Sequence, residues 1–309
     1  MKILMVMNKT LSNDVNEWVD SGHTNLYLPL KELGHKVYWY DTVRGDKKPL
    51  KDIVDDFKPD LMWCCMTGDQ NITPNEPWED IIETTRKGNC KTFNWFCDDS
   101  WRFNTFSSKV CSYFHMCATS ERRFIDKFNA IGYNSIILGA GCPGINFSLL
   151  SGPYKKEYEV SFCGHLSNDR KRLIDILSSK EINIKRFHGL EYKEMLESIA
   201  KSYIGINFSK NAGSTQMKQR VFEVTAAGSL LFTEYHDGIE EFFEIDKEIV
   251  CFKNDYEMYE KLKVLLNNKN IIEKISQNGH KRFLKEYDAK VRLPMILNKI
   301  MKGQHVKKV

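Results

Sequence analysis

Residues 141–163 read GCPGINFSLLSGPYKKEYEVSFC, and this stretch decides how the chain is divided. Its first part, 141–153, is dense in Gly, Pro and Ser, which favour turns and are typical of a linker. Residues 159–163 then have the pattern of a β-strand. A linker followed by a new strand predicts that a second domain begins here, at residue 149.

On the N-terminal side of the linker, strand and helix patterns alternate. The expected strands are 2–7, 35–40, 61–66, 91–97, 116–119 and 135–139. The expected helices are 24–33, 49–57, 78–87 and 121–131. Repeated β–α units of this size predict a parallel sheet that is covered by helices on both faces.

The alternation restarts after the linker. The expected strands are 159–163, 184–187, 204–208, 229–233 and 248–252, and the expected helices are 168–178, 192–200, 215–227, 255–266 and 271–287. We therefore predict an α/β fold of two Rossmann-like, doubly wound domains, 1–148 and 149–288, facing a cleft. Residues 289–309 are expected to form a C-terminal helix and a basic tail. Ligands bind at the carboxyl ends of the strands in such sheets, so the cleft is the expected site.

Composition excludes several classes of protein. The 309 residues include 45 basic and 41 acidic ones, and this net charge of +4 is too small to indicate nucleic-acid binding. No apolar run reaches the roughly 18 residues of a membrane-spanning helix, and the apolar start at 1–7 stops too early for a secretory signal. Nine cysteines without a CxxC pair argue against a disulfide framework and a structural zinc site. We expect free thiols in a cytoplasmic protein.

Two common nucleotide motifs are missing from the sequence. The loop after the first strand, 8–14, contains no glycine, so it is not the G-x-G-x-x-G of a dinucleotide site. No G-x-x-x-x-G-K-[ST] phosphate loop occurs either. A dehydrogenase and a P-loop NTPase are therefore disfavoured.

The strongest local signal is NFSKNAGSTQMKQRVFEVTAAG at 207–228. A strand ends, a small polar loop follows, and a helix begins whose terminal amides attract phosphate. Gln216, Arg220 and Glu223 are expected to share one face of that helix. Arg220 can bind a diphosphate as a fork, and Glu223 can accept from ribose hydroxyls. The alternative is a solvent-exposed Arg–Glu pair of little energetic value.

Further donor-site candidates follow other strands of the second domain. Lys210 and Lys218 flank the same loop. Gly164 and His165 come after the strand 159–163, and Arg170 adds a positive charge to the next helix; a purely structural strand–turn–helix is the alternative. Asp237 and Gly238 follow the strand 229–233, where backbone amides can meet a phosphate or sugar hydroxyl, unless they form a plain Asp-Gly turn.

The catalytic candidates lie in the first domain. Asp98 and Asp99 come at the carboxyl end of the strand 91–97, where either can act as general base for an acceptor hydroxyl or hold a sugar hydroxyl. One of them merely capping the following turn is the alternative. His23, before the first helix, is the other candidate, although a lone histidine there is more often structural or acceptor-binding.

Several of these residues resemble a known family. The run 219–223 (QRVFE), with Ala227-Gly228, Asp237-Gly238 and the run 248–252, resembles the donor-site signature of the CgeB-like (spore maturation protein type) glycosyltransferases. Residues 160–164 with Arg170, and the strand end at Asp98-Asp99, are also similar. The resemblance implies a GT-B fold with a sugar nucleotide on the second domain and an acceptor on the first. It also implies a C-terminal helix that crosses back to the first domain.

One departure from the broader group leaves the stereochemistry open. Many retaining members carry a second Glu eight positions before the helix Glu, and here that position is Thr215. The role of Glu223 on the ribose carries over, whereas a role for an upstream Glu on the donor sugar does not.

The sequence and the resemblance together predict a metal-independent glycosyltransferase. It would move a sugar from a nucleoside diphosphate, with a UDP-sugar as the expected donor, to an acceptor hydroxyl. No cofactor beyond this co-substrate and no DxD metal motif is expected. The acceptor is left open between a glycan, a protein, a small molecule and modified DNA. The rival functions are a sugar-nucleotide epimerase or hydrolase on the same fold, and a non-catalytic nucleotide-binding partner.

Overall fold

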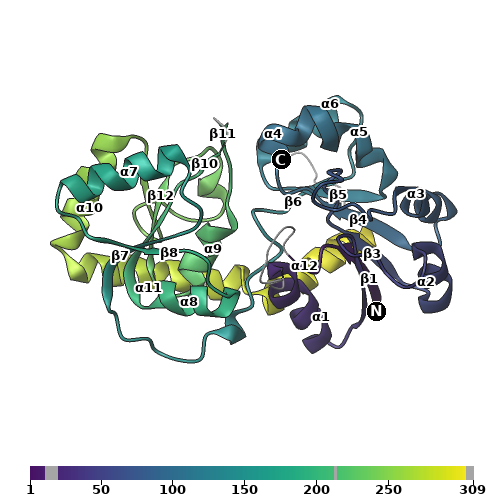
Figure 1. Cartoon of the computed structure of the whole chain (residues 1–309), viewed down its shortest axis with the longest axis horizontal. Helices are drawn as coiled ribbons and strands as arrows, with labels where there is room; N and C mark the ends of the chain where they lie inside the picture. The colour runs from purple at the N-terminus through teal and green to yellow at the C-terminus, as the bar shows by residue number, and fades with distance from the viewer. Residues whose placement is uncertain (11–19, 212–213, 304–309) are drawn as a thin grey trace. The chain divides into compact units, whose positions relative to one another are not determined.

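The computed structural model describes residues 1–10, 20–211 and 214–303. These residues form two compact units, each built from a parallel sheet and helices (Figure 1). Unit 1 comprises residues 1–146 together with the stretch that begins at Ala289, and unit 2 comprises residues 147–288. Within the described ranges, no helix combines the length and the apolar composition needed to cross a membrane. The predicted α/β class is confirmed.

The sheet of unit 1 is parallel, with the strands in the order β2-β1-β3-β4-β5-β6. Its strands are β1 (Lys2–Met7), β2 (Lys36–Asp41), β3 (Leu61–Cys64), β4 (Lys91–Trp95), β5 (Met116–Thr119) and β6 (Ile136–Leu138). The first strand is flanked by β2 and β3, so that Val6 lies beside Tyr40 on one side and Cys64 on the other. This order places the carboxyl ends of β1, β3 and β4 next to each other.

The helices of unit 1 follow the strands in sequence. They are η1 (His23–Tyr27), α1 (Leu28–Glu32), α2 (Leu50–Phe57), α3 (Trp78–Lys87), α4 (Asp99–Arg102), η2 (Phe103–Ser107), α5 (Ser108–Val110), η3 (Cys111–Tyr113), α6 (Arg122–Ala130) and α12 (Ala289–Lys302). The π-helical turn η1 begins at His23 and residues 21 and 22 are already helical, so His23 lies inside the first helical stretch and does not precede it.

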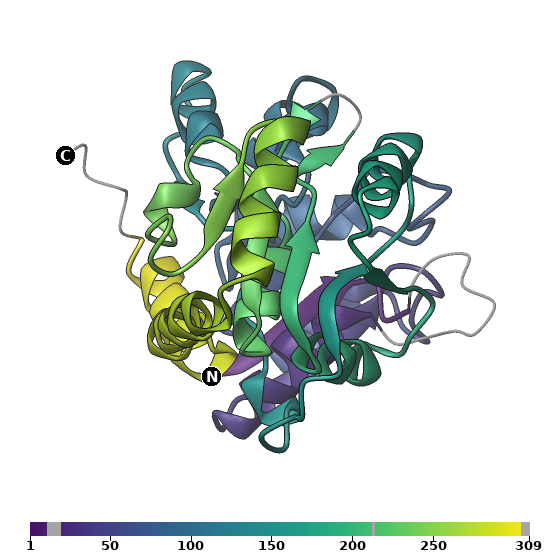
Figure 2. The ribbon, with the colours of Figure 1, turned by 90° about the vertical axis from the view of Figure 1, so that its left-hand side faces the viewer.

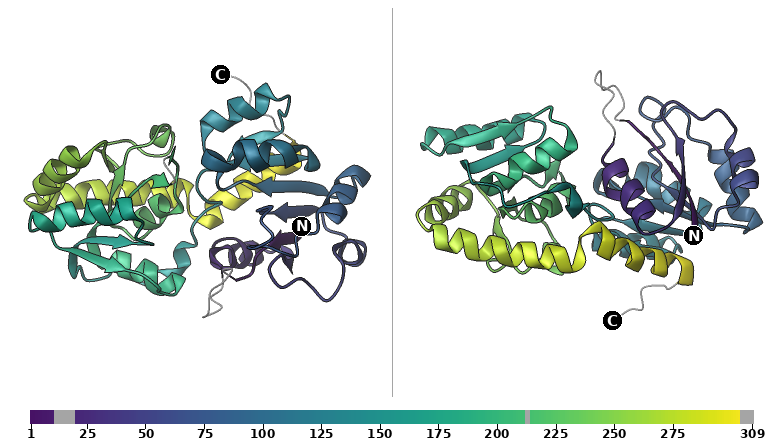
Figure 3. Two further views of the ribbon diagram at one scale, coloured as in Figure 1. Left: turned by 45° about the horizontal axis from the view of Figure 1, so that its top comes forward. Right: turned by 90° about the horizontal axis from the view of Figure 1, so that it is seen from below.

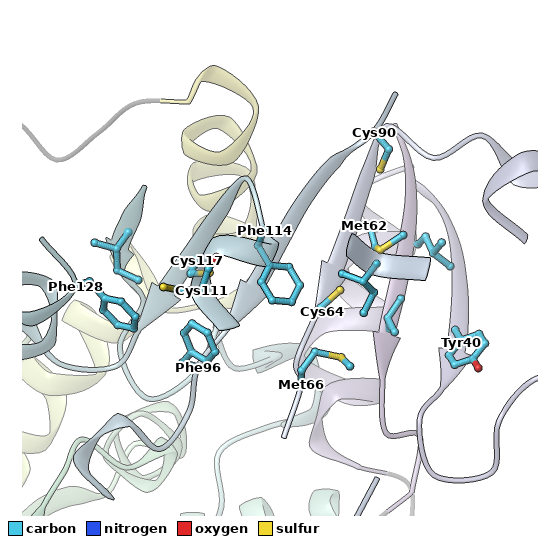
Figure 4. Close-up of a cluster of buried hydrophobic side chains, with 14 of the residues drawn as sticks. Tyr40, Met62, Cys64, Met66, Cys90, Phe96, Cys111, Phe114, Cys117 and Phe128 are labelled. Carbon is cyan, nitrogen blue, oxygen red and sulfur yellow. The ribbon is translucent and has the colours of Figure 1, made fainter. Parts of the chain in front are cut away.

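Alternate residues of β1 point into two separate cores. Leu4 and Val6 pack with α2, α3 and α6 in a cluster rich in sulfur, to which Met62, Cys64 and Cys117 contribute (Figure 4). Ile3 and Met5 pack on the opposite face of the sheet with α1 and α12. Apolar side chains on both faces explain why β1 is a continuous apolar run in the sequence.

The C-terminal helix α12 belongs to unit 1, although the whole of unit 2 precedes it in the sequence (Figure 3). Leu293, Leu297 and Ile300 are buried in the second of the two cores. Arg292 donates from Nη2 to the carbonyl oxygen of Gly139 over 2.7 Å. The amide of Ala289 donates to the carbonyl of Ile145, which ties the start of α12 to the end of the first stretch of unit 1.

The main sheet of unit 2 is also parallel, in the order β13-β12-β9-β7-β8. The strands of unit 2 are β7 (Tyr158–Cys163), β8 (Ile184–Phe187), β9 (Ser202–Asn207), β10 (Lys210–Asn211), β11 (Ser214–Thr215), β12 (Leu230–Glu234) and β13 (Val250–Phe252). The helices are η4 (Phe147–Leu149), α7 (Asn168–Ser179), α8 (Tyr192–Ala200), α9 (Gln219–Ala226), η5 (Ile239–Glu241), α10 (Asp255–Leu266) and α11 (Lys269–Glu286). Figure 2 looks onto α10, which packs with α7 on one face of this sheet.

One predicted helix starts later than the sequence suggested. Residues 215–227 were expected to be helical, but β10 and β11 form a short antiparallel hairpin and α9 begins at Gln219. The amide of Gln216 donates to the carbonyl of Ser209 over 3.1 Å, next to this hairpin. Gln216 therefore precedes α9, and its predicted place on one helix face with Arg220 and Glu223 is wrong.

Candidate functional site

The start of α9 carries a partly buried ion pair. Nη1 of Arg220 lies 2.6 Å from Oε2 of Glu223, and the two side chains are 19% and 4% exposed. Gln219 donates from Nε2 to the other oxygen of Glu223 over 2.7 Å. The pair is thus not the solvent-exposed pair of the alternative interpretation. Removing one partner of a buried pair leaves an uncompensated charge, which is strongly destabilising.

A second arginine interacts electrostatically with Arg220. Arg170, on the first turn of α7, donates from Nη1 to the carbonyl of His165 over 3.0 Å. Its Nε is buried and has no hydrogen-bond partner in the described part of the chain. Burial lowers the pKa of Arg170, and the positive charge of Arg220 lowers it further. The charges of the two guanidinium groups therefore interact, and Nε of Arg170 is an unused donor in the described part of the chain.

A buried carboxylate completes the cluster. Glu234 ends β12 and accepts from the backbone amide of Lys210 over 3.0 Å and from the Ser209 hydroxyl over 3.3 Å. The ammonium of Lys210 lies 3.1 Å from the other oxygen of Glu234. Glu234 was not predicted as a site residue from the sequence. The signal that could have found it is an acid on the last residue of an otherwise apolar strand.

We call Arg170, Lys210, Arg220, Glu223 and Glu234 the charge cluster. Arg170 follows β7, Lys210 follows β9, and Glu234 ends β12, so the cluster lies at the carboxyl edge of the sheet of unit 2. Three cationic and two anionic side chains leave an excess of one positive charge. Guanidinium groups bind phosphate oxygens as a planar fork, so this arrangement is suited to a phosphorylated ligand.

A cavity of about 570 Å³ lies at the carboxyl ends of β7 and β8. It is lined by Phe162, Gly164, His165, Leu166 and residues 185–188. Gly164 has φ of +144°, a conformation that favours glycine, and its amide donates to the carbonyl of Phe187 over 3.2 Å. Residues 185–188 were not predicted as site residues, because a strand end without a motif gives no signal in the sequence.

The remaining donor-site candidates also lie in unit 2. Lys218 is the N-cap residue of α9 and is half-buried. Asp237 and Gly238 come after β12, at the same end of the sheet as Glu234. Asp237 is exposed, and Gly238 has φ of +88° at the N-cap of η5.

In unit 1, the structure separates the two adjacent aspartates. Asp99 is 1% exposed and accepts a hydrogen bond of 2.5 Å from the hydroxyl of Thr119. Burial raises the pKa of Asp99 to about 6, against the opposing effect of hydrogen bonds from Ser107 and Thr119. Asp98 is half-buried and is the N-cap residue of α4. Its side chain makes no capping hydrogen bond within the described part of the chain. Of the two, Asp98 is the one that reaches solvent.

His23 lines a separate cavity in unit 1. Its ring stacks on Tyr27 and Trp39, with centroid distances of 5.3 and 6.0 Å. The cavity measures about 570 Å³ and is also lined by Lys9 and Asp41, near the ends of β1 and β2. Burial, followed by the charge of Lys31, lowers the pKa of His23. The imidazole is therefore neutral at pH 7 and able to accept a proton.

We expect Asp99 to make stability depend on pH between about pH 4 and pH 6. Its pKa in the folded protein is about 6, above the ordinary value of 3.8 that applies to the unfolded chain. The folded state is therefore favoured most below pH 3.8, where Asp99 is protonated in both states, and this contribution to stability is lost as the pH rises through 6. At about 1.4 kcal/mol per pKa unit, the ionised buried carboxylate costs about 3 kcal/mol at neutral pH. Denaturant unfolding measures the free energy of unfolding of Asp99→Asn minus that of the wild type. We expect this difference to favour the variant more at about pH 7.5 than at about pH 4.5. An equal difference at both pH values would contradict this.

A metal site would need a group of at least three His, Cys, Asp or Glu side chains. Residues 1–10, 20–211 and 214–303 contain no such group.

Comparison with known proteins gives a family and a fold. Residues 138–298 match the sequence model of a family described as glycosyl transferase-like. No curated protein matches the chain in sequence.

Solved structures resemble the chain over almost its whole length. HepE from Anabaena, solved with UDP and glucose, has a TM-score of 0.65 and 11% identity, covering 98% of this chain and 100% of that one. An alpha-glucosyltransferase, solved with UDP-glucose and DNA containing an abasic site, has a TM-score of 0.67 and 13% identity, covering 97% and 99%. Sucrose-phosphate synthase from Thermosynechococcus elongatus has a TM-score of 0.65 and 7% identity, covering 98% and 100%. At these identities the likeness shows the fold, which is the predicted GT-B architecture.

Proposed function

Since the chain belongs to the glycosyl transferase-like family, we propose that it moves a sugar from a UDP-sugar to an acceptor hydroxyl. The observation that carries this proposal is the group of cationic side chains, Arg170, Lys210 and Arg220, at the carboxyl edge of the sheet of unit 2. Like charges held together in a partly buried place are stabilised by an anion between them. The UDP and UDP-glucose complexes of structurally similar proteins support a diphosphate of uridine as that anion.

The arginines would also act on the chemical step. When the bond between sugar and phosphate breaks, negative charge grows on the leaving diphosphate, and fixed cations that face this charge lower the barrier. We propose that Arg170, Arg220 and Lys210 supply this positive charge without a metal ion, supported by Lys218 and the first amides of α9.

Glu223 is proposed to bind the ribose. Each of its oxygens already accepts one hydrogen bond, from Gln219 or Arg220, and each keeps a second acceptor site for a ribose hydroxyl. The nucleobase is proposed to enter the cavity beside Gly164 and His165, where Phe162 and Leu166 provide apolar surface. Asp237 and Gly238 are proposed to contact the sugar or the phosphate.

On the acceptor side we propose Asp98 as general base. It follows a strand of unit 1 and is half-buried, whereas Asp99 is enclosed by protein. His23 is the second candidate, because its neutral imidazole lines a cavity. The acceptor is a glycan, a protein, a small molecule or modified DNA.

We also propose that the chain belongs to the CgeB-like type of glycosyltransferase. The residues of unit 2 that resemble the donor-site signature of that type, 219–223 and 248–252 among them, support this proposal.

A thermal-shift panel of nucleotides tests the proposed donor site. A ligand that binds only the folded state at 100 times its Kd stabilises it by about 2.7 kcal/mol. We expect UDP to raise the Tm, UMP to raise it less because the contact of the second phosphate is lost, and ADP and GDP to act less than UDP. A Tm that no nucleoside diphosphate raises would contradict the proposal. Equal effects of UMP and UDP would contradict the diphosphate contact with the arginines.

A further inference from the structure

Two cysteines that are distant in the sequence touch in unit 1. Sγ of Cys65 lies 3.6 Å from Sγ of Cys97. Cys65 directly follows β3, and Cys97 follows β4, which is the neighbouring strand of the sheet. The contact therefore depends on the pairing of two adjacent parallel strands.

Backbone hydrogen bonds hold Cys65 and the residue before Cys97 in place. The amide of Cys65 continues the sheet by donating to the carbonyl of Val6 over 3.1 Å. Next to Cys97, the amide of Phe96 donates to the carbonyl of Ala118 over 2.9 Å. The backbone of Cys65 is thus hydrogen-bonded to one neighbouring strand, and so is that of Phe96, the residue before Cys97.

This pair is also the one that a solvent-borne reagent can reach. All nine cysteines are free thiols, and Cys97 is exposed while Cys65 is half-buried. Six of the other cysteines are buried, and Cys163 in unit 2 is half-buried. A disulfide bond is about 2.05 Å long, so the two sulfur atoms need to approach by about 1.5 Å for the bond to form.

We propose that Cys65 and Cys97 form a modification site, a dithiol that peroxide converts reversibly into an intrachain disulfide. The thiolate of Cys65 attacks one oxygen of hydrogen peroxide, which forms a sulfenic acid and releases hydroxide. The sulfur of Cys97 then attacks the sulfenic sulfur and expels its oxygen as water. In total, two thiols and one peroxide give one disulfide and two waters. A dithiol reductant reverses the reaction by thiol–disulfide exchange.

The hydrogen bond between the two sulfur atoms fits this order of events. The pKa of Cys97 is raised first by its hydrogen bond to Cys65, and the charges of Asp98 and Asp20 add to the effect. Cys97 therefore keeps its proton and is the resolving thiol. The resulting bond would join the segments that follow β3 and β4, one residue before Asp98. The site rests on the thiols alone and does not depend on the proposed sugar transfer.

Disulfide mapping on the full chain tests the site. The protein is treated with a small excess of hydrogen peroxide, alkylated, digested and examined by mass spectrometry before and after dithiothreitol. We expect a peptide that links Cys65 to Cys97, the loss of two of the nine free thiols, and full recovery on reduction. Cys65→Ser and Cys97→Ser should each abolish the linked peptide, and Cys163→Ser should leave it unchanged.

The Cys65→Ser variant also distinguishes Cys65 from its neighbour Cys64. A linked peptide that persists in this variant would overturn the assignment, since the bond would then involve another cysteine. A wild type that yields no linked peptide, or only singly oxidised Cys97, would overturn the proposal.

Discussion

Replacing Arg220 by alanine is expected to weaken UDP binding by about ten- to a hundredfold. The loss of a charge-assisted hydrogen bond costs roughly 1.5–3 kcal/mol, and every 1.4 kcal/mol is about a factor of ten in Kd. Turnover should fall in addition, because the charge on the diphosphate grows as the sugar leaves. Calorimetry with UDP and steady-state kinetics with the matching UDP-sugar measure the two effects separately.

The burial of the pair makes controls necessary. Arg220→Ala leaves Glu223 buried without its cation, which destabilises a protein by about 3–5 kcal/mol, so the unfolding curve of each variant must be recorded. Arg170→Ala removes the second guanidinium, while Glu234, whose charge acts on Arg170, keeps its ion pair with Lys210. This variant should weaken UDP binding to a similar extent. Arg172→Ala is the matched control, because Arg172 lies on the same helix in an exposed pair with Asp255. Wild-type affinity in folded Arg170→Ala and Arg220→Ala would mean that the donor site lies elsewhere.

Glu223→Gln separates binding from chemistry. Ribose contacts change little between the ground state and the transition state, so this variant should bind the donor more weakly while its turnover at saturation stays near that of the wild type.

Replacing Asp98 by asparagine is expected to lower turnover by about 100-fold or more. A general base that removes the proton of the acceptor hydroxyl contributes roughly 10²–10⁴-fold, and the amide of asparagine cannot take up this proton. The affinity for UDP should not change, because the nucleotide contacts proposed here come from unit 2. Kinetics under saturating donor and calorimetry with UDP on the same sample check both parts.

The adjacent Asp99 provides the comparison for Asp98. Asp99→Asn alters a buried carboxyl and should act on the pH dependence of stability more than on turnover. Wild-type turnover in Asp98→Asn would move the base elsewhere, and His23→Gln is then the variant to examine.

The alternation of elements could be predicted because both sheets are parallel and covered on two faces. Their strands are short, nearly continuous apolar runs, as in β1 or β12, and Gly or Pro marks many of the turns between them. The hairpin formed by β10 and β11 could not be predicted, since small polar residues before a helix are also typical of an N-cap loop. For this reason the expected helix began too early.

The site could be predicted only as far as it depends on local spacing. Arg220 and Glu223 are three residues apart, and they do form a contact on α9. That the pair is partly buried, that the charges of Arg170 and Arg220 interact, and that Glu234 binds Lys210 all depend on the order in which β7, β9 and β12 pair. The contact between Cys65 and Cys97 depends on strand pairing in the same way. Their separation of 32 residues gives no sequence signal.

The most direct test of sugar transfer is to follow a panel of UDP-sugars by proton NMR in the presence of the purified protein, with and without a cell extract as the source of acceptor. We expect one UDP-sugar to be converted to free UDP, slowly with water and faster with the extract, and Arg220→Ala to suppress both rates. Conversion of a UDP-sugar to its epimer without release of UDP, or no conversion of any UDP-sugar under either condition, would contradict this expectation.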